Sequence, residues 1–251
     1  MTEPTQPTAA MLVIGDEILS GSIREANAHH LAGVLTEIGI RLVEVRIVED
    51  RRAAIIGAVR ALSAAVDHLF TSGGIGPTHD DITADCVAEA LGASIDVRED
   101  ARARLEAYYG AGELNDARLR MARIPQGARL IDNPLSQAPG FTLGNVHVMA
   151  GVPAIFEVML AGLAPGLEGG PPLRAHAFRA PVPEGDLADD LRGLDAAHPQ
   201  VAIGCYPFYR KGLGCTVVLR SSHAPSLDAA AAALRTLLAR HTDDIAETPP
   251  D

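Results

Sequence analysis

The sequence contains little cysteine, in no pattern typical of a cysteine-based site. The three cysteines of the 251-residue chain are Cys86, Cys205 and Cys215, an odd number with no Cys-x-x-Cys pair. This usage argues against a disulfide framework and against a structural zinc site, and it favours a reducing compartment. We therefore expect a cytoplasmic protein.

Long apolar runs and an excess of basic charge are also missing. No apolar run approaches the roughly 20 residues that span a bilayer, and residues 1–10 lack the charged-then-apolar order of a secretion signal. The chain has 21 Lys and Arg against 32 Asp and Glu, and its basic residues are scattered. A nucleic-acid binder normally clusters them on one face. We expect neither a membrane nor a nucleic-acid partner. A small anionic ligand is compatible with the negative net charge, because local loop geometry can outweigh a mildly repulsive global field.

Several common catalytic signatures are absent as well. The sequence has no Walker A motif and no Gly-x-Gly-x-x-Gly fingerprint. Its nine histidines form no His-x-x-x-His spacing and no recognisable Ser/His/Asp set. A hydrolase of the catalytic-triad type is therefore unsupported.

What the first half of the chain does contain is an alternation of strand and helix patterns. Short apolar runs predict strands at residues 11–15, 41–48 and 68–71, and a helical period predicts helices after each of them, around residues 31–38, 51–65 and 83–91. Such alternation is typical of a mainly parallel sheet. We predict a three-layer α/β domain over residues 11–165 with helices on both faces of the sheet.

The second half is predicted from weaker signals. We expect one helical segment at residues 98–124, a hairpin at 141–149 that turns at Gly144-Asn145, and a helix from Pro153 to Leu163. Residues 164–172 are rich in proline and glycine and predict a linker. Beyond it we expect a small α+β domain at 173–245, with a turn at Lys211-Gly212 and a frayed end over residues 242–251.

The most informative segment follows the third predicted strand. It is the run Ser72-Gly73-Gly74-Ile75-Gly76-Pro77-Thr78, which leads to the next helix. Glycines let a backbone approach a bound group closely and adopt positive φ, and successive N–H groups before a helix form an anion-binding nest. The alternative is a tight turn with Asp81 or Thr83 as a helix N-cap. We interpret the run as a phosphate-binding loop.

Carboxylates surround this loop in the predicted fold. Asp80 and Asp81 lie at its end, Asp50 follows the second strand, and Asp16 and Glu17 follow the first. The carboxyl ends of parallel strands meet at one sheet edge, so these groups should lie near the loop. Because Mg²⁺ binds one or two carboxylates together with substrate phosphates, the set indicates metal-assisted phosphoryl or nucleotidyl chemistry. Helix capping is the alternative for Asp50 and for one of the Asp80-Asp81 pair.

Five ordered motifs resemble one known family. They are Gly15-Asp16-Glu17-Ile18-Leu19-Ser20-Gly21 with Asn27, Val48-x-Asp50, the glycine loop through Thr83, Asn133-Pro134-x-Ser136-x-Ala138-Pro139-Gly140, and Gly151-Val152-Pro153. Together they are similar to the N-terminal domain of the competence/damage-inducible protein A (CinA) family, within the molybdopterin-binding superfamily of MoaB/Mog-like proteins. The region with Ile203-Gly204-Cys205-Tyr206-Pro207 is similar to that family's companion domain.

The resemblance implies two activities for one site. In Mog-like relatives the loop and two aspartates serve molybdopterin adenylylation. In CinA-like and FAD-synthase-like relatives the site is similar to a metal-dependent pyrophosphatase acting on ADP-ribose or FAD, and this chain is closer to that branch. We expect a metal-dependent nucleotide pyrophosphatase. Molybdopterin binding or adenylylation, and a non-catalytic nucleotide-binding module, are the alternatives.

Residue roles follow from the matching motif positions. Asp50 and Asp81 are the expected catalytic groups, and which of them is the base is open. Glu17, Asp50 and Asp81 are the expected ligands of a divalent Mg, Mn or Co ion. The expected phosphate- or ligand-binding residues are Asp16, Asn27, Ser72, Gly73, Gly74, Gly76, Pro77, Thr78, Ser136, Gly151 and Pro153. Molybdopterin is the alternative ligand.

The chain also departs from its relatives. Full-length CinA proteins carry a nicotinamide-nucleotide amidase domain, and FAD-synthase-like fusions carry an adenylyltransferase domain. Residues 173–251 are too few for the amidase and show none of its pattern, so we expect neither activity in this chain. Because relatives form dimers or trimers, the resemblance implies a homo-oligomer.

Overall fold

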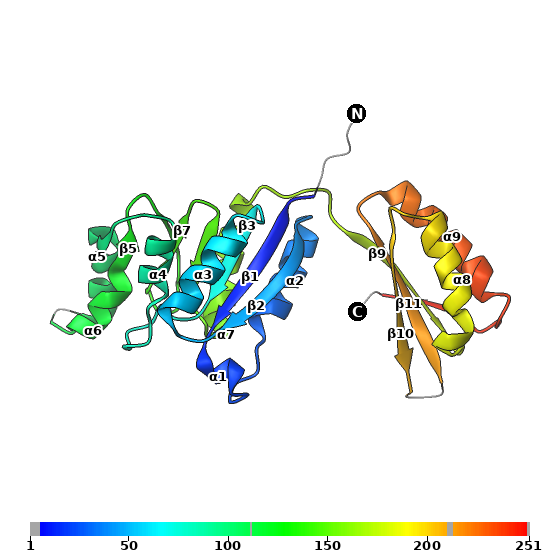
Figure 1. Cartoon of the computed structure of the whole chain (residues 1–251), viewed down its shortest axis with the longest axis horizontal. Helices are drawn as coiled ribbons and strands as arrows, with labels where there is room; N and C mark the ends of the chain where they lie inside the picture. Colours follow the sequence, from blue (N-terminus) through cyan, green and yellow to red (C-terminus); the bar gives the residue numbers. More distant parts are fainter. Residues whose placement is uncertain (1–5, 111, 210–212, 250–251) are drawn as a thin grey trace. The chain divides into compact units, whose positions relative to one another are not determined.

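The chain divides into two compact units. The computed structural model describes residues 6–110, 112–209 and 213–249, and the division between the units falls at Gly170 and Pro171 (Figure 1). This point lies inside the proline- and glycine-rich segment 164–172. No helix in the described part of the chain is long and apolar enough to cross a bilayer.

The first half of unit one alternates strands and helices, as predicted. Its elements are β1 (Thr8–Ile14), α1 (Asp16–Leu19), α2 (Asn27–Glu37), β2 (Arg41–Val48), α3 (Arg52–Ser63), β3 (His68–Ser72) and α4 (Thr83–Ala90). The one departure is α1, a single helical turn where the sequence indicated an open turn. It forms because the backbone N–H of Ser20 bonds to the carbonyl of Asp16 at 2.9 Å.

These strands build a mainly parallel sheet. The strand order is β2-β1-β3-β8-β7-β6, with β8 at Val146–Met149, β7 at Gly140–Leu143 and β6 at Arg129–Ile131. The pairs β1–β2, β1–β3 and β3–β8 are parallel, whereas β7 pairs antiparallel with both β8 and β6. The chain moves outward from β1 to β2 and then crosses to β3 on the other side. The strand order therefore reverses between β1 and β3.

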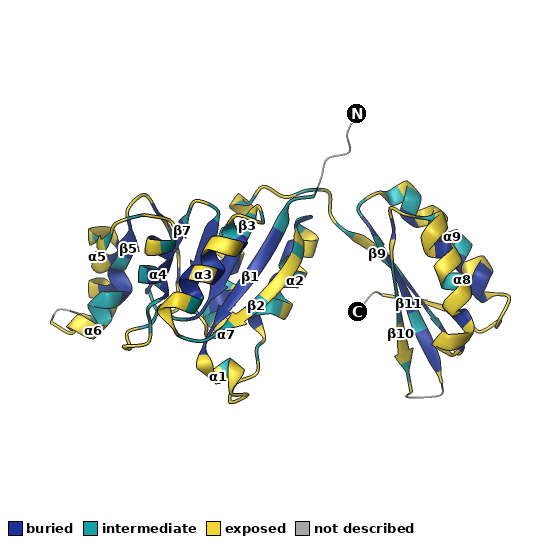
Figure 2. Cartoon of the chain, viewed as in Figure 1, coloured by how far each residue is buried: buried dark blue, intermediate teal, exposed yellow. Residues whose placement is uncertain are grey.

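Helices cover both faces of this sheet. In β1, Ala10, Leu12 and Ile14 pack into a core with residues of α3 and α4, while Met11 and Val13 pack into a second core with residues of α2 and α7 (Pro153–Leu163). Figure 2 shows β1 buried along its length. The predicted three-layer architecture is confirmed, and its physical basis is a central strand that is apolar on both faces.

The predicted helix over residues 98–124 is wrong. This region forms α5 (Glu99–Tyr109), α6 (Asp116–Leu119), a 3₁₀ turn η1 (Arg120–Ala122) and β5 (Arg123–Pro125), which pairs with β4 (Ile95–Val97). Gly110 ends α5 with a φ of 93°, a conformation that favours glycine. Asn115 then caps α6 by accepting the N–H of Arg118 at 2.9 Å. The two small strands β4 and β6 were not predicted.

The hairpin and the last helix of unit one agree with the sequence. β7 and β8 turn at Gly144, whose φ is 58°, and the Asn145 side chain donates to the carbonyls of Ser63 and Val66 at 2.9 Å each. Helix α7 has Pro153 in its first turn. A short 3₁₀ turn, η2 (Ala164–Gly166), follows it.

Unit two is the predicted small α+β domain. Its elements are β9 (Arg174–Ala180), α8 (Glu184–Ala197), β10 (Ala202–Phe208), β11 (Gly214–Ser221), α9 (Ala224–Leu238) and β12 (Ala246–Thr248). The sheet is antiparallel, in the order β10-β11-β9-β12. Its core joins residues such as Phe178, Val217 and Leu219 to Leu227 and Leu234 of α9.

Two expectations concern the end of unit two. The prediction of a frayed end is wrong for residues 246–248, because β12 pairs with β9. Glu247 holds it there, with His176 at 2.8 Å and Arg235 at 2.6 Å. The predicted turn at Lys211-Gly212 lies outside the described residues.

A buried histidine in unit one gives a prediction about acid stability. His147 of β8 is 3% exposed and bonds to Thr142 at 3.0 Å and to His68 at 3.2 Å. Burial, His68 and Arg129 lower the pKa of His147 from 6.5 to about 3. Below pH 6.5 the unfolded chain therefore binds a proton at this residue that the folded chain does not. Stability should fall from there toward pH 3, by up to about 1.4 kcal/mol per pH unit for one proton.

The measurement is urea unfolding across this pH range for the wild type and His147→Gln. The variant loses packing and is less stable at neutral pH, but its pH slope should be flatter by one proton. Equal slopes in the two proteins would contradict the assignment.

Candidate functional site

A cleft opens at the carboxyl ends of the parallel strands. Gly15 follows β1, Asp50 follows β2, Gly73 follows β3 and Gly151 follows β8, and all four line one cavity of about 690 Å³. This size is typical of small-molecule sites. The cleft lies where the strand order reverses between β1 and β3, which is the usual ligand position in such sheets.

The glycine loop is packed too tightly for side chains. Gly73 has a φ of 106°, and a Cβ there would lie 2.2 Å from the carbonyl oxygen of Ile14. Gly74 has a φ of 69°, and its Cβ would lie 2.1 Å from Oγ1 of Thr83. The N–H of Thr83 also donates to the carbonyl of Gly74 at 3.0 Å. The loop is therefore held between the end of β1 and the start of α4.

Asn27 joins three segments at the base of the cleft. Its Nδ2 donates to Oγ of Ser72 at 2.7 Å and to the carbonyl of Gly151 at 2.8 Å. This links the first turn of α2 to the ends of β3 and β8. A Cβ on Gly151 would come within 3.1 Å of the Cα of Gly73. Asn27 is 5% exposed, and its buried Oδ1 has no hydrogen-bond partner among the described residues.

Asp81 closes the turn that follows the loop. Its Oδ2 accepts the backbone N–H of Thr78 at 2.8 Å and the Thr78 hydroxyl at 2.5 Å. A Cβ on Gly76 would lie 2.6 Å from the same Oδ2. One carboxylate oxygen of Asp81 is thus committed to shaping the loop, and Asp81 also lines the cleft.

Asp50 is held beside other carboxylates. Its Oδ2 accepts the backbone N–H of Asp16 at 2.9 Å. Burial raises the pKa of Asp50 above its usual range, and repulsion from Asp16, Glu17 and Asp80 adds to this, while the hydrogen bond from Asp16 opposes it. Asp50 therefore holds its negative charge at an energetic cost that a cation would relieve.

The cleft lining is strongly acidic. It contains the carboxylates of Glu17, Glu25, Asp50, Asp80 and Asp81 and one basic side chain, Arg24. Glu25 is already engaged, because it accepts the backbone N–H of residue 28 at the start of α2 at 3.0 Å. Within residues 6–110, 112–209 and 213–249, no three His, Cys, Asp or Glu side chains form a closed metal-binding group. A bound metal would need oxygen ligands from its substrate as well.

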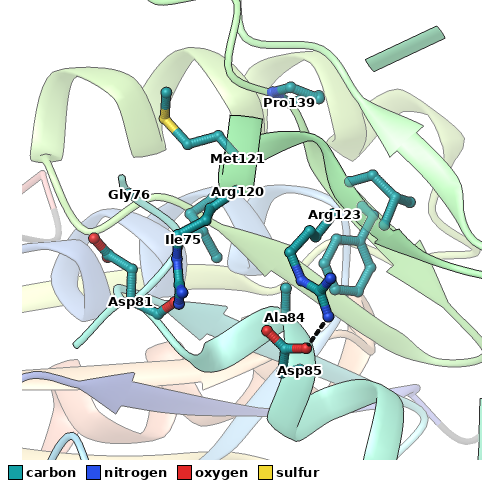
Figure 3. A pocket seen from close by; sticks show the side chains of 12 residues that line it. Ile75, Gly76, Asp81, Ala84, Asp85, Arg120, Met121, Arg123 and Pro139 are labelled. Atoms are coloured by element: carbon teal, nitrogen blue, oxygen red, sulfur yellow. Dashed lines mark hydrogen bonds and ion pairs between the residues drawn. The ribbon is translucent and has the colours of Figure 1, made fainter. Parts of the chain in front are cut away.

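Two arginines support the loop from the side of η1 and β5. Figure 3 shows Arg120 and Asp81 together at a small pocket, and Arg120 donates to the backbone carbonyl of Asp81 at 3.2 Å. Beside it, Arg123 forms an ion pair with Asp85 of α4 at 2.5 Å. Both arginines were predicted on a continuous helix, so these contacts could not be predicted from the sequence.

Most of the expected site residues come together in the cleft. Those that line it are Glu17, Asn27, Asp50, Ser72, Gly73, Gly74, Gly76, Pro77, Asp81, Ser136, Gly151 and Pro153. Asp16 and Thr78 lie outside the lining but bond to Asp50 and Asp81, respectively.

Sequence reasoning missed other cleft residues, and one of them had a signal. Asn133 stands in the same motif as Ser136, and its side chain donates to Oγ of Ser136 at 2.6 Å and to the carbonyl of Ala138 at 2.9 Å. Arg24 and Tyr109 also line the cleft. Nothing in their local sequence marks them, because both belong to segments without a recognisable motif.

Comparison with known proteins decides the family. Residues 10–169 match the family model described as a probable molybdopterin binding domain. The chain belongs to this family. It is CinA-like, as its motifs predicted. Residues 172–244 of this CinA-like chain match the model described as the middle domain of FAD synthase.

Individual relatives agree with both matches. A CinA-like protein of Citrifermentans bemidjiense is 40% identical over 157 residues, which are 60% of this chain and 38% of that protein. A protein named probable FAD synthase from Caenorhabditis elegans is 30% identical over 95% of this chain and 51% of its own length. The chain thus spans about half or less of these curated relatives. The crystal structure of CinA from Thermoplasma acidophilum is 34% identical, with a TM-score of 0.61 over 64% of this chain and 97% of that one.

Two glycines with the same backbone angle test the packing of the loop. Gly74 and Gly92 both have a φ of 69°, but a Cβ on Gly92 would meet nothing within 4 Å. Gly92→Ala should cost about 1–2 kcal/mol from backbone strain alone. Gly74→Ala should cost about 1–3 kcal/mol more, from the overlap with Thr83. Chemical unfolding of both variants measures the difference, and equal losses would show that the loop is not packed as described.

Two aspartates provide a test of the electrostatics with opposite signs. The pKa of Asp50 is raised by burial, so Asp50→Asn should raise the melting temperature at pH 7, with the gain vanishing below the ordinary aspartate pKa of 3.8. The pKa of Asp67 is lowered by hydrogen bonds from Thr8. Asp67→Asn should therefore lower the melting temperature at pH 7, and this loss should vanish as the pH falls through the lowered pKa. Thermal unfolding in metal-free buffer measures both, and a stabilised Asp67→Asn or a destabilised Asp50→Asn would refute the charge balance.

Proposed function

We propose that residues 10–169 form a metal-dependent nucleotide pyrophosphatase that hydrolyses ADP-ribose or FAD-like dinucleotides. The observation that carries the proposal is the tightly packed glycine loop beside an acidic cleft. A phosphate in this cleft would meet backbone N–H groups on one side and several carboxylates on the other. Among the described residues, Arg24 is the one basic side chain that lines the cleft, so binding of a pyrophosphate calls for a cation.

The residues present fit such a cation. Mg²⁺ takes one or two carboxylates plus phosphate oxygens and waters, rather than a closed protein cage. One or two of Glu17, Asp50 and Asp81 would hold it at the edge of the cleft, and the repulsion that raises the pKa of Asp50 would be relieved there. When bound, the cation would supply neutralisation of pyrophosphate charge. Mg, Mn and Co are the candidates.

The loop and the cleft walls would orient the substrate. Backbone N–H groups of the loop, together with the start of α4, would hold one phosphate. Ile18, Ile23, Tyr109 and Met121 add apolar surface to the cleft, which suits the flat ring system of a dinucleotide.

The two aspartates would then have different tasks. Asp81 accepts two hydrogen bonds from Thr78 and shapes the loop. Asp50 lines the cleft at the end of β2, and a carboxylate is one of the side chains that can act as a general base. We assign to Asp50 the role of taking a proton from the attacking water at its carboxylate oxygen. Hydrolysis of ADP-ribose would then give AMP and ribose 5-phosphate.

Molybdopterin binding is the second candidate. It is favoured by the family description matched by residues 10–169. The same loop would then hold the phosphate of the pterin, with or without adenylylation. A module that binds a nucleotide without changing it would use the same contacts. Neither alternative releases AMP from a dinucleotide.

Product analysis tests the proposal. The full chain is incubated with ADP-ribose, FAD or NAD in the presence of Mg²⁺, Mn²⁺ or Co²⁺, or with chelator. We expect AMP only with metal. Asp50→Asn should lower kcat by about 10²–10⁴-fold, as expected for loss of a general base. Asp81→Asn should abolish turnover.

Asp189→Asn is the matched control, because Asp189 is an exposed residue of α8 in unit two. It should retain full activity. If no dinucleotide is cleaved with any metal, the pyrophosphatase assignment fails. Binding of molybdopterin, or of a nucleotide that is left unchanged, is then the explanation to test, and calorimetry measures that binding.

A further inference from the structure

Both helices of unit two lie on one face of its sheet. The order strand, helix, strand, strand, helix, strand is that of a ferredoxin-like fold, and Figure 1 shows α8 and α9 on the same side of β9, β10 and β11. Phe178, Cys205 and Val217 face these helices, because they pack in the core that α8 and α9 share. Since side chains alternate along a strand, the residues next to them face the other way. Within the described residues of unit two, no helix covers that second side, which we call the open face.

The open face carries aromatic and basic side chains. Its residues include Arg179 of β9, Gly204, Tyr206 and Phe208 of β10, and Thr216 and Arg220 of β11. The register supports this assignment, because Tyr206 pairs with Thr216, and Thr216 pairs with Arg179. Tyr206 and Phe208 are two residues apart on one strand, a separation of about 7 Å. Their rings therefore follow one another along β10.

Glycines of the sheet make room for both rings. A Cβ on Gly204 would lie 2.8 Å from the hydroxyl oxygen of Tyr206 and 2.9 Å from its Cε2, so the Tyr206 ring lies over Gly204. A Cβ on Gly214 would lie 2.5 Å from Cζ of Phe208, so the Phe208 ring lies over Gly214. Tyr206 is nevertheless 51% exposed. Aromatic rings on an open four-stranded sheet are the surface on which some RNA-binding domains stack bases.

An arginine from another strand accompanies each ring. The guanidinium carbon of Arg179 lies 3.7 Å from the centroid of the Phe208 ring, and Arg220 donates to the hydroxyl of Tyr206 at 3.4 Å. A guanidinium group can stack on a base through its plane, and it can bind phosphate through its N–H donors. The two pairs thus combine stacking surfaces with a group that recognises phosphate.

Charge is segregated in unit two. Along the described residues of β9, β10, β11 and β12, the open face has no Asp or Glu. Glu247 of β12 faces the helices, where it pairs with His176 and Arg235. On that same side, α8 carries Glu184, Asp186, Asp189, Asp190 and Asp195. The net charge of −11, from which we expected no nucleic-acid partner, therefore does not describe the open face.

We propose that the open face of unit two binds single-stranded nucleic acid. One base stacks on the exposed ring of Tyr206, and a neighbouring base stacks on the guanidinium group of Arg179, which Phe208 supports from below. Arg220, at the hydroxyl end of Tyr206, contacts a backbone phosphate. Single strands are the partner because the bases of a duplex are stacked on one another and offer no ring faces to a sheet. Sequence preference is weak, since every base has a face that can stack.

Fluorescence anisotropy of labelled oligonucleotides measures this binding. The full chain, with chelator present, is titrated into oligo-uridylate or oligo-thymidylate of about 20 nucleotides, and into the duplex of oligo-thymidylate with its complement. We expect each single strand to bind about tenfold or more tightly than the duplex. The tighter single strand identifies the partner as RNA or DNA, because the 2′-hydroxyl is the group that distinguishes them.

Tyr206→Leu tests the stacking contact. Loss of one stacked base should weaken binding of both single strands about fivefold or more. Tyr108→Leu is the matched control, because Tyr108 is a tyrosine of α5 in unit one that is 50% exposed. It should leave the affinity unchanged. Melting temperatures show that each variant is folded.

Arg220→Gln tests the phosphate contact. The slope of log affinity against log salt should become shallower by about 0.7, the value for one phosphate contact to a single strand. Arg192→Gln removes the same charge from α8, where the arginine side chain is 77% exposed. This control should keep the slope of the wild type.

Competitors separate the open face from other binding sites. Excess ADP-ribose should not displace the oligonucleotide, whereas displacement would place the probe in the cleft of unit one and overturn the proposal. Poly-glutamate at an equal concentration of charge should not displace it either. Displacement by poly-glutamate would overturn the proposal and assign the open face to an acidic protein partner.

The remaining outcomes are equally distinct. Preference for single strands, with affinity lowered by Tyr206→Leu and the salt slope lowered by Arg220→Gln but by neither control, supports the proposal. Absence of binding to both single strands at low salt overturns it. Equal binding of the duplex, or full binding by Tyr206→Leu, also overturns it, because neither result is compatible with bases stacked on the sheet.

Discussion

The site depends on backbone segments that meet without side chains between them. At the carboxyl edge of the first sheet, Gly73 lies against the carbonyl of Ile14, and Gly151 lies against Gly73. Any Cβ at these points would separate β1, β3 and β8 and open the floor of the cleft. Asn27 then ties the same segments together by hydrogen bonds to Ser72 and Gly151. The position of the glycine loop is thus a consequence of close packing in the sheet below it.

The carboxylates of the cleft repel one another in the protein alone. Asp50 is buried enough for its pKa to rise, and its carboxylate neighbours raise it further. The backbone hydrogen bond from Asp16 opposes this rise. Perturbed carboxylates in a cleft are typical of functional sites.

The interruption at residues 110–125 shows how distant segments complete the site. Gly110 ends α5, and the chain returns through η1 to place Arg120 under the glycine loop. An unbroken helix over 98–124 would have carried Arg120 away from Asp81. The sequence of this region is rich in Arg, Ala and Leu, which favour helix anywhere. Its breaks are set by Gly110, which ends α5, and by the pairing of β4 with β5, two three-residue strands that carry too little local signal to predict.

By itself the sequence determined the order of strands and helices in the first half of unit one, the presence of helices on both faces of its sheet, the family and the residues that follow each parallel strand. These features are local, because apolar periodicity, glycine runs and capping residues act within a few positions. Only the tertiary structure decided that Thr78 forms a hydrogen bond to Asp81, whereas Asp50 has a raised pKa. It also decided that Arg24, Tyr109 and Asn133 line the cleft and that β12 pairs with β9. Those facts depend on contacts between segments far apart in the chain, whose burial and charge no single stretch of sequence contains.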